Sequence, residues 1–182
     1  NSCISQMCSI VISIFKKQLE LLDSASKNFP ETKLVVFPEF SNFFKTLTFF
    51  RNTAGAGQYF SNLFPHPVLI VDNSKISTES KFQSKTIFLD SQKGVLGSYD
   101  KYLLAPFGEY MPLILKDLDK ALGLNSPAIQ ENPEYQNGRK PPEAISGDSG
   151  LKVGSLTCSD IFSPHLVQNI SSSGANLIIS QS

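Results

Sequence analysis

The 182-residue sequence has no tryptophan, only 2 histidines and 3 cysteines, and no excess charge of either sign. Its 16 basic and 16 acidic residues give a formal net charge of +0, and the longest basic runs are pairs such as Lys16-Lys17. Proteins that bind nucleic acid usually carry a basic patch that neutralises phosphates. We therefore expect no nucleic-acid partner.

The small numbers of cysteines and histidines argue against a disulfide framework and against a metal site. Cys3, Cys8 and Cys158 are too few for the disulfide framework of a small secreted domain. Cys3 and Cys8 could pair if the local backbone brought them together, but two small thiols, buried or terminal, are the simpler interpretation. Because there is no Cys-x-x-Cys pair and no histidine pair at helical spacing, we expect neither a metal site nor a cofactor.

Long hydrophobic runs are also lacking. The most apolar run, Cys8 to Phe15, is far shorter than the roughly 20 residues that span a bilayer. No basic segment precedes it and no small-residue cleavage site follows, so a signal peptide is not indicated. We expect this run to be the buried start of a helix.

The first half of the chain alternates helical and extended patterns. Apolar residues near helical spacing predict a helix over 10–25. Short continuous apolar runs predict buried strands over 33–40 and 67–74, with a helix and a loop between them. Two further strands joined at Gln92-Lys93-Gly94 are expected to form a hairpin over 85–104.

The second half begins with a segment of a different kind. Residues 117–149 are rich in proline, asparagine, glycine and charge, which predicts a long surface excursion with one short helix. A strand ending at Cys158, a helix over 164–173 and a last buried strand over 175–180 follow. This alternation is typical of an α/β domain whose sheets are covered by helices.

Three potentially reactive side chains, Glu39, Lys101 and Cys158, each follow a predicted strand. Taken singly, each has an ordinary explanation: a solvated carboxylate, a surface lysine and a packed core thiol. Sites in α/β folds gather at the carboxyl ends of strands, however, and residues that meet in space are often distant in sequence. The occurrence of all three at such positions therefore favours a site.

The chemistry of the three groups is coherent. A cysteine attacks an acyl carbon as the thiolate, which requires a base and electropositive surroundings. Glu39 could take the thiol proton and pass it to the leaving group. Lys101, with backbone N–H groups after Cys158, could hold the negative oxygen of the tetrahedral intermediate.

Three stretches carry a resemblance to a known family. VVFPEF, YDKYLLAPFGEYMP and SLTCSDIFSP resemble the catalytic motifs of the nitrilase (carbon–nitrogen hydrolase) superfamily, with its Glu-Lys-Cys triad. Pro-Phe-Gly-Glu-Tyr-x-Pro after Tyr-x-Lys, with NGRKPPEAI, is most similar to one branch, the apolipoprotein N-acyltransferases. The resemblance runs from about Leu19 to the end of the sequence, and only the three motifs are specific.

The resemblance implies a four-layer αββα sandwich of the α/β (α+β) class. Residues 1–182 would form a single domain, incomplete at both ends and without the membrane-spanning part of that branch. The implied activity moves a phospholipid acyl group to Cys158 as a thioester and then to the N-terminal amine of a lipoprotein. This activity implies a location at the bacterial inner membrane, facing the periplasm, and contact with the membrane surface through the absent part.

The resemblance also implies roles for further residues. Glu109 would be a second essential carboxylate that supports Lys101, and Asp160 would orient the cysteine loop. Ser159 stands where tyrosine is usual and so changes one wall of the site, and Tyr99 belongs to the Tyr-x-Lys motif as a supporting residue. Phe107, Tyr110 and Met111 are predicted to bind substrate by facing the acyl chains.

Two other functions remain open. A soluble, cytoplasmic carbon–nitrogen hydrolase acting on a small amide or nitrile fits the absence of membrane segments from the sequence. A catalytically inactive domain that serves only for interaction fits Ser159 and the early end of the last strand. The first would release ammonia from amides or nitriles, and the second would contain an unreactive Cys158.

Overall fold

The structure is a computed structural model that describes residues 2–78, 81–130 and 134–182. The side chains of residues 2–8, 128 and 130 are outside the described part, and so is the question of a Cys3–Cys8 pair. The helices are α1 (Ser2–Asn28), α2 (Phe43–Leu63), α3 (Leu113–Ala121), α4 (Pro127–Gln130) and α5 (Pro164–Ser172). A 3-10 turn covers Cys158–Phe162.

The strands form two sheets. The first sheet has the order β1-β2-β3-β4, with β1 (Leu34–Val36), β2 (Leu69–Ser77), β3 (Phe82–Asp90) and β4 (Gly94–Asp100). β1 is parallel to β2, and the other pairs are antiparallel. The second sheet has the order β5-β6-β7, with β5 (Ile145–Ser146) antiparallel and β7 (Leu177–Gln181) parallel to the central β6 (Lys152–Thr157).

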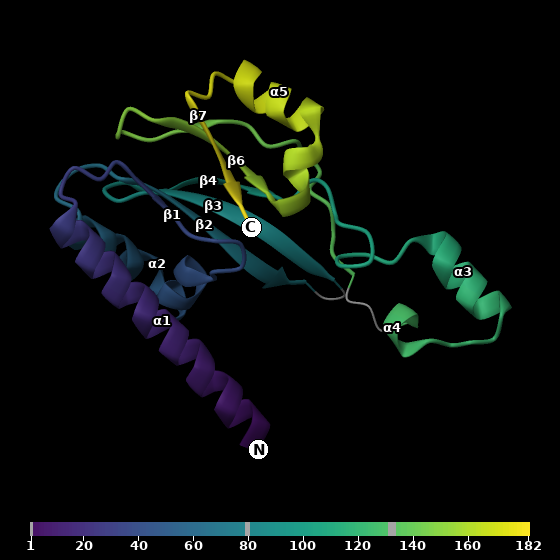
Figure 1. Ribbon diagram of the computed structural model, residues 1–182. Coiled ribbons are helices and arrows are strands. Elements are labelled where there is room, and N and C mark those ends of the chain that lie inside the picture. The colour runs from purple at the N-terminus through teal and green to yellow at the C-terminus, as the bar shows by residue number, and fades with distance from the viewer. Residues whose placement is uncertain (1, 79–80, 131–133) are drawn as a thin grey trace.

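The two sheets pack face to face and helices cover both outer faces, as Figure 1 shows. α1 and α2 cover the first sheet through a core that includes Phe15, Phe43 and Ile70. α5 covers the second sheet, where Ile170 packs with Leu156. This is the α-β-β-α order of layers, so the predicted fold class is confirmed.

The interior between the sheets changes from apolar to polar along the strands. Successive side chains of a strand point to opposite faces, so every second residue faces the partner sheet. The apolar part of this interior is built from Leu69, Val71, Phe88 and Val153, with Ile179 packed against them. The same faces then continue with buried polar residues: Asn73, Ser84, Thr86, Ser155, Thr157 and Gln181. Hydrogen bonds among these residues satisfy groups that would otherwise be costly to bury.

Several predicted elements are confirmed. The buried strand expected over 67–74 is β2, and the expected hairpin is β3 and β4, closed by Gly94 at φ 82. The predicted helix over 164–173 is α5, which begins with Pro164 after Ser163, whose hydroxyl accepts a hydrogen bond from Leu166 N. Proline at the first helical position and serine as the N-cap are favoured because both suit the unpaired N–H groups there.

Three expectations about burial are wrong. The strand expected over 33–40 is only β1, and Val36 is 42% exposed because β1 pairs with one neighbour, β2, within the described residues. The last strand, β7, is likewise an edge strand, and Leu177 and Ile178 are exposed. The run before Phe15 is helical but not buried, because the first half of α1 extends past the sandwich.

The excursion expected over 117–149 also differs. The described residues of this range include two helices, not one, and the first of them, α3, already begins at Leu113. α3 and α4 stand away from the sandwich in Figure 1. Among the described residues, no helix combines the length and apolarity needed to cross a membrane.

Gly154 allows the close approach of α5 to β6. A Cβ atom at this position would lie 2.0 Å from Ile170 Cγ2. We predict that Gly154→Ala lowers the free energy of unfolding by about 1–3 kcal/mol, because overpacking forces α5 away from the sheet. Denaturant unfolding followed by circular dichroism measures this change.

The matched control is Gly57→Ala in α2, where a Cβ atom would meet nothing within 4 Å. This variant should be neutral or gain up to about 1 kcal/mol from helix propensity. Equal stability of Gly154→Ala and the unsubstituted protein would contradict the packing argument.

Candidate active site

Lys101 lies directly after β4, where the backbone is held on both sides. Its N–H donates to Ser84 O at 2.8 Å, and its carbonyl accepts from Gly138 N at 2.7 Å. The residue is 1% exposed, so its ammonium group is enclosed by the protein. A buried charge must be paired to be tolerated, and carboxylates supply that pairing here.

Glu109 is the closer partner of Lys101. Its Oε1 lies 2.7 Å from Lys101 Nζ, and its Oε2 accepts a hydrogen bond of 2.7 Å from Ala105 N. The backbone N–H of Glu109 also donates to Ala105 O at 2.9 Å. The turn over 105–109 therefore fixes both oxygens of a carboxylate that is itself buried.

Glu39 approaches Lys101 from the end of β1. Its Oε1 is 3.4 Å from Lys101 Nζ, a longer contact than that of Glu109. The chain around Glu39 is bent by left-handed residues, Phe40 at φ 56 and Asn42 at φ 52. Such residues are strained and persist only where their surroundings hold them. Asn73 Oδ1 contributes by accepting a hydrogen bond of 3.0 Å from Phe40 N.

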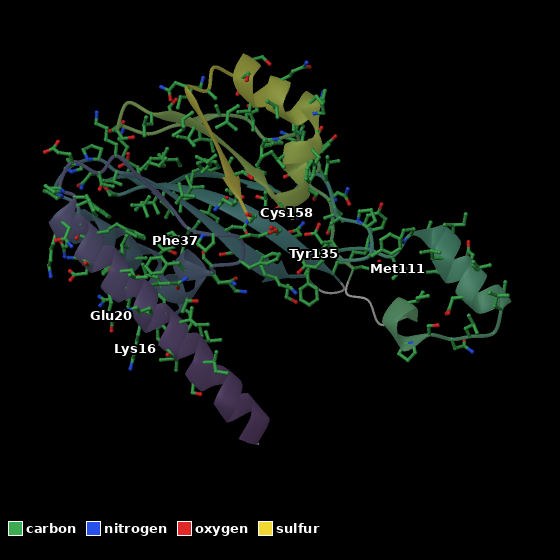
Figure 2. The ribbon with its side chains drawn as sticks, viewed as in Figure 1. Lys16, Glu20, Phe37, Met111, Tyr135 and Cys158 are labelled. Atoms are coloured by element: carbon green, nitrogen blue, oxygen red, sulfur yellow. The ribbon has the colours of Figure 1, made fainter. Side chains whose placement is uncertain are left out.

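Cys158 opens the 3-10 turn that follows β6, with a left-handed φ of 50. The strand, the turn and α5 thus form a sharp strand-to-helix junction that carries the thiol. The first N–H groups of a helical turn have no partner within it, so they can receive a negative oxygen. Figure 2 shows Cys158 at this junction.

Two side chains join the cysteine turn to the segment after Lys101. Asp160 Oδ1 accepts a hydrogen bond of 2.7 Å from Leu103 N, and Ser159 Oγ donates to Leu103 O at 2.7 Å. Asp160 is buried. The structure therefore connects Asp160 and Ser159 to the strand end that carries Lys101, and it brings these residues together with Glu39 and Glu109.

The surroundings of the cluster shift the pKa values of two of its ionisable groups, Glu39 and Lys101. Burial, with the charges of Glu109 and Asp160, raises the pKa of Glu39 more than the charge and hydrogen bond of Lys101 lower it. Burial alone would lower the pKa of Lys101, but the hydrogen bond and charge of Glu109, with the charges of Glu39 and Cys158, outweigh it and raise this pKa. A carboxylate that takes up a proton readily, beside a lysine that stays cationic, suits general base catalysis next to an oxyanion.

The remaining predicted residues lie at the border of the cluster or behind it. Tyr99 lies between the sheets, where its hydroxyl donates to Ser155 O and burial raises its pKa to about 12. Phe107 and Tyr110 are exposed on a turn closed by a hydrogen bond of 2.8 Å from Phe107 N to Tyr110 O. Met111 lies near the base of α3, farther from Cys158 than Tyr135 in the view of Figure 2. Substrate contact by these three side chains stays a prediction.

A second layer of contacts around the cluster was not predicted from the sequence. Tyr135 N donates to Glu109 O at 2.9 Å and Gly138 N to Lys101 O, so part of the expected surface excursion lies against the site. Gly138 was the residue in the sequence that could have indicated this close packing. A Cβ atom at this position would lie 2.3 Å from Asp100 O, so a glycine is required there. Asn73 and Gln181, both buried, were also missed.

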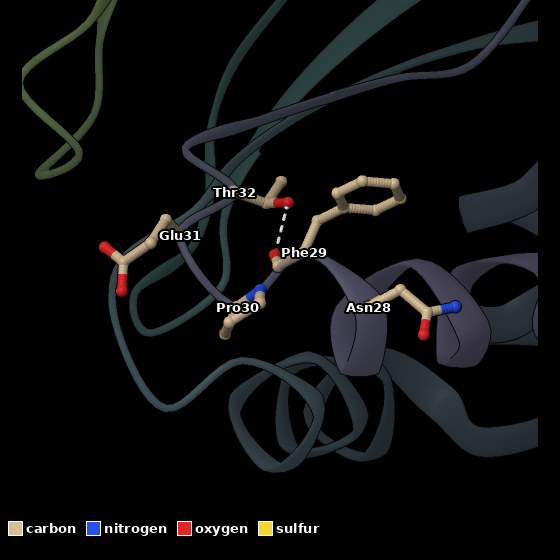
Figure 3. Close-up of a pocket in the computed structure, with 5 residues that line it drawn as sticks. All are labelled: Asn28, Phe29, Pro30, Glu31 and Thr32. Atoms are coloured by element: carbon tan, nitrogen blue, oxygen red, sulfur yellow. Dashed lines mark hydrogen bonds between the residues drawn. The ribbon is translucent and has the colours of Figure 1, made fainter.

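A surface hollow lies away from this cluster, in the turn from α1 to β1, as Figure 3 shows. It is lined by Asn28, Phe29, Pro30, Glu31 and Thr32. Within it, Thr32 Oγ1 donates to Phe29 O at 2.7 Å, which closes the turn. Glu31 is the sole ionisable residue in this lining, so the hollow offers much less chemistry than the cluster around Lys101.

Comparisons with known proteins agree with this geometry. Residues 8–182 match the family model described as carbon-nitrogen hydrolase. Similar solved structures include a carbon-nitrogen hydrolase from Helicobacter pylori G27 (TM-score 0.65, 17% identity, 94% of this chain and 55% of that chain). An amidase from Nesterenkonia sp. is also similar (TM-score 0.60, 17% identity, 93% of this chain and 58% of that chain). No curated protein matches the chain significantly. The chain thus spans less than two thirds of these structural neighbours.

Glu109→Gln tests the division of roles between the two carboxylates. The amide cannot accept from both Lys101 and Ala105 N, so Lys101 shifts and kcat should fall about 100-fold. The charge of Glu109 also raises the pKa of Glu39, and its removal lowers that pKa. A general base acts in its unprotonated form, so, with Glu39 as the predicted base, the acid limb of kcat/KM should move to lower pH in a pH–rate profile.

Glu134→Gln is the control, since Glu134 pairs with Lys81 and Lys116 at the surface. It should leave both kcat and the pH profile unchanged. An acid limb of Glu109→Gln that stays in place or moves to higher pH would show that Glu109 does not act on Glu39.

Proposed function

The chain belongs to the carbon-nitrogen hydrolase family, and we propose that it transfers acyl groups through a thioester on Cys158. One observation carries the proposal: a buried lysine lies between two carboxylates at the junction that presents a thiol. Nucleophile, base and oxyanion partner are all present, and none of them requires a metal or a cofactor.

The first half of the reaction forms the thioester. Glu39 takes the proton of the Cys158 thiol as Sγ bonds to the carbonyl carbon of the substrate. The carbonyl electrons move to the oxygen, which Lys101 and the N–H groups of the 3-10 turn stabilise. When the oxygen re-forms its double bond, the bond from the carbonyl carbon to the leaving group breaks, which is a carbon–nitrogen bond in an amide and a carbon–oxygen bond in a phospholipid ester. The leaving amine or alcohol oxygen receives the proton from Glu39.

The second half releases the acyl group. A second nucleophile loses its proton to Glu39 and attacks the thioester carbon, and the same groups hold the oxyanion. The carbon–sulfur bond then breaks, and the thiolate of Cys158 regains the proton. Whether this nucleophile is water or an amine distinguishes a hydrolase from an acyltransferase.

We favour water, and therefore amide hydrolysis of the amidase type, as the first candidate. The structural neighbours from Nesterenkonia sp. AN1 support it, because they are amidases with an active site cysteine. In one of them acrylamide has added to this cysteine, and in another the acetamide moiety of fluoroacetamide is attached there. A small amide would then yield a carboxylic acid and ammonia.

Acyl transfer to an amine is the second candidate, favoured by apolar side chains near the site. Leu113 and Ile114 of α3 are each 76% exposed, and Phe107 is exposed on the preceding turn. Exposed apolar groups on a helix that stands away from the body suit contact with lipid. The segment Pro-Phe-Gly-Glu-Tyr-x-Pro supports the same candidate, with phospholipid as donor, a lipoprotein as acceptor and the periplasmic face of the inner membrane as location.

The central test uses the full-length protein with two substrate sets. A short amide assayed by ammonia release tests hydrolysis, and phospholipid vesicles with a diacylated lipopeptide, assayed by mass spectrometry, test acyl transfer. We expect one of these products, and an acyl adduct on Cys158 in the intact mass. Cys158→Ala should lower the rate by at least about 1,000-fold, because the nucleophile is lost.

Cys8→Ala is the matched control, since it removes another thiol and should leave the rate unchanged. Full activity of Cys158→Ala would overturn the proposed function. An inactive interaction domain would instead contain a Cys158 that reacts with iodoacetamide no faster than Cys3 or Cys8.

A paired substitution in α3 separates the two candidates. Leu113→Ser with Ile114→Ser removes exposed apolar area, so it should weaken binding to anionic phospholipid vesicles about tenfold or more in a sedimentation assay. Hydrolysis of a short amide should not change. Leu21→Ser on the exposed side of α1 is the control. Unchanged vesicle binding in the paired variant would contradict the second candidate.

A further inference from the structure

The side chain of Gln181 joins the two halves of the catalytic cluster from behind. It lies near the end of β7, between the sheets, and is 2% exposed. Its Nε2 donates to Phe37 O at 2.6 Å, and its Oε1 accepts from Ser155 Oγ at 2.9 Å. Phe37 precedes Glu39 by two residues, and Ser155 precedes Cys158 by three. In the view of Figure 2, the end of β7 lies between Phe37 and Cys158.

The contact with Phe37 occurs where the chain leaves the first sheet. Phe37 N still donates to Val71 O of β2 at 2.9 Å, which extends the pairing of β1 by one residue. The next residue, Pro38, has no N–H with which to continue the sheet. The buried carbonyl of Phe37 is therefore bound across the sandwich, by a side chain from the second sheet.

A second route runs from Gln181 toward the nucleophile. Thr86 Oγ1 lies 3.4 Å from Gln181 Oε1 and 3.1 Å from Thr157 Oγ1, and Thr157 directly precedes Cys158. Asn73 Nδ2 also donates a hydrogen bond of 3.2 Å to Thr86 Oγ1. All four side chains are buried, so water does not compete for these hydrogen bonds.

Two buried side-chain amides therefore bind the backbone on either side of Glu39. Asn73 of the first sheet accepts from Phe40 N, one residue after Glu39. Gln181 of the second sheet donates to Phe37 O, two residues before it. Gln181 belongs to the sheet that carries Cys158 and contacts the Glu39 segment directly, whereas Asn73 reaches that sheet indirectly, through Thr86 and Thr157.

We propose that Gln181 is a positioning residue that sets the place of Glu39 relative to Cys158. The inference rests on the proposed function, because it assumes that Glu39 exchanges a proton with the thiol. Gln181 acts through Phe37, Ser155 and Thr86, and its own amide takes no part in bond making. A shift of a reacting group by 1 Å can cost about 100-fold in rate.

Gln181→Leu tests the proposal because it places an uncharged side chain of similar size at this position but removes the hydrogen bonds to Phe37, Ser155 and Thr86. We expect kcat for the short amide to fall about 10- to 100-fold, with KM changed less than about 2-fold, because the base is displaced and the substrate site is not. The second-order rate of Cys158 alkylation by iodoacetamide should fall as well. All variants are assayed at temperatures where circular dichroism shows them folded.

Asn169→Leu is the matched control. Asn169 Nδ2 donates to Pro142 O at 2.8 Å, which is the same kind of amide-to-carbonyl bond away from the cluster. This variant should lose stability while keeping kcat within about 2-fold of the unsubstituted protein. A merely structural role for Gln181 predicts instead that both variants lose kcat alike or keep it alike.

Gln181→Glu adds a readout that stability alone does not produce. Its carboxyl group can still accept from Ser155 Oγ, but it can donate to Phe37 O only when it is protonated. The ratio of its kcat to that of the unsubstituted protein should therefore rise as pH is lowered. This variant also decides the question if Gln181→Leu does not fold.

The proposal is overturned if folded Gln181→Leu keeps full kcat, if Asn169→Leu loses as much kcat as Gln181→Leu, or if the kcat ratio of Gln181→Glu does not depend on pH. Failure of the proposed function would be recognised by a different measurement, the alkylation rate of Cys158. In that case Cys158 of the unsubstituted protein is alkylated no faster than Cys3 or Cys8.

Discussion

The ammonium group of Lys101, held away from water between two carboxylates, is the interaction on which the site depends. Removing one partner of such a buried pair typically costs about 3–5 kcal/mol, because the remaining charge is left uncompensated. Glu109, at 2.7 Å and with both oxygens occupied, is the partner that neutralises the lysine. Glu39, at 3.4 Å, has the weaker contact and the raised pKa, so it is the carboxylate that can exchange a proton. The different surroundings of the two carboxylates therefore suit them to different roles.

This arrangement requires that segments from both sheets keep their positions. Apolar packing fills the part of the sandwich around Val71 and Phe88, but contacts of this kind have little directional preference. Toward the cluster, the same strand faces carry amides and hydroxyls, whose hydrogen bonds are directional. The change from hydrocarbon to hydrogen bonds therefore occurs where a fixed geometry between the sheets matters for chemistry.

The sequence predicted the elements whose pattern is local and missed those whose reason is distant. β2, the β3–β4 hairpin and α5 follow from apolar runs, a glycine turn and a serine–proline start. Glu39, Lys101 and Cys158 were found because each follows a strand. The short extent of β1 depends on which strands pair with it, and no pattern within 33–40 records this. Gln181 resembles any polar residue at a strand end until its partners from two other strands are known.

The segment over 134–138 supports the site largely through backbone N–H groups. Tyr135 N binds Glu109 O, Gln136 N binds Phe82 O, and Gly138 N binds Lys101 O. Every amino acid except proline supplies such an N–H group, so these contacts survive most substitutions at 135 and 136. Gly138 differs, because a Cβ atom there would lie 2.3 Å from Asp100 O. The side chain at position 136 can therefore change the polarity of the surface beside the cluster, while the backbone hydrogen bonds to Phe82, Lys101 and Glu109 are kept.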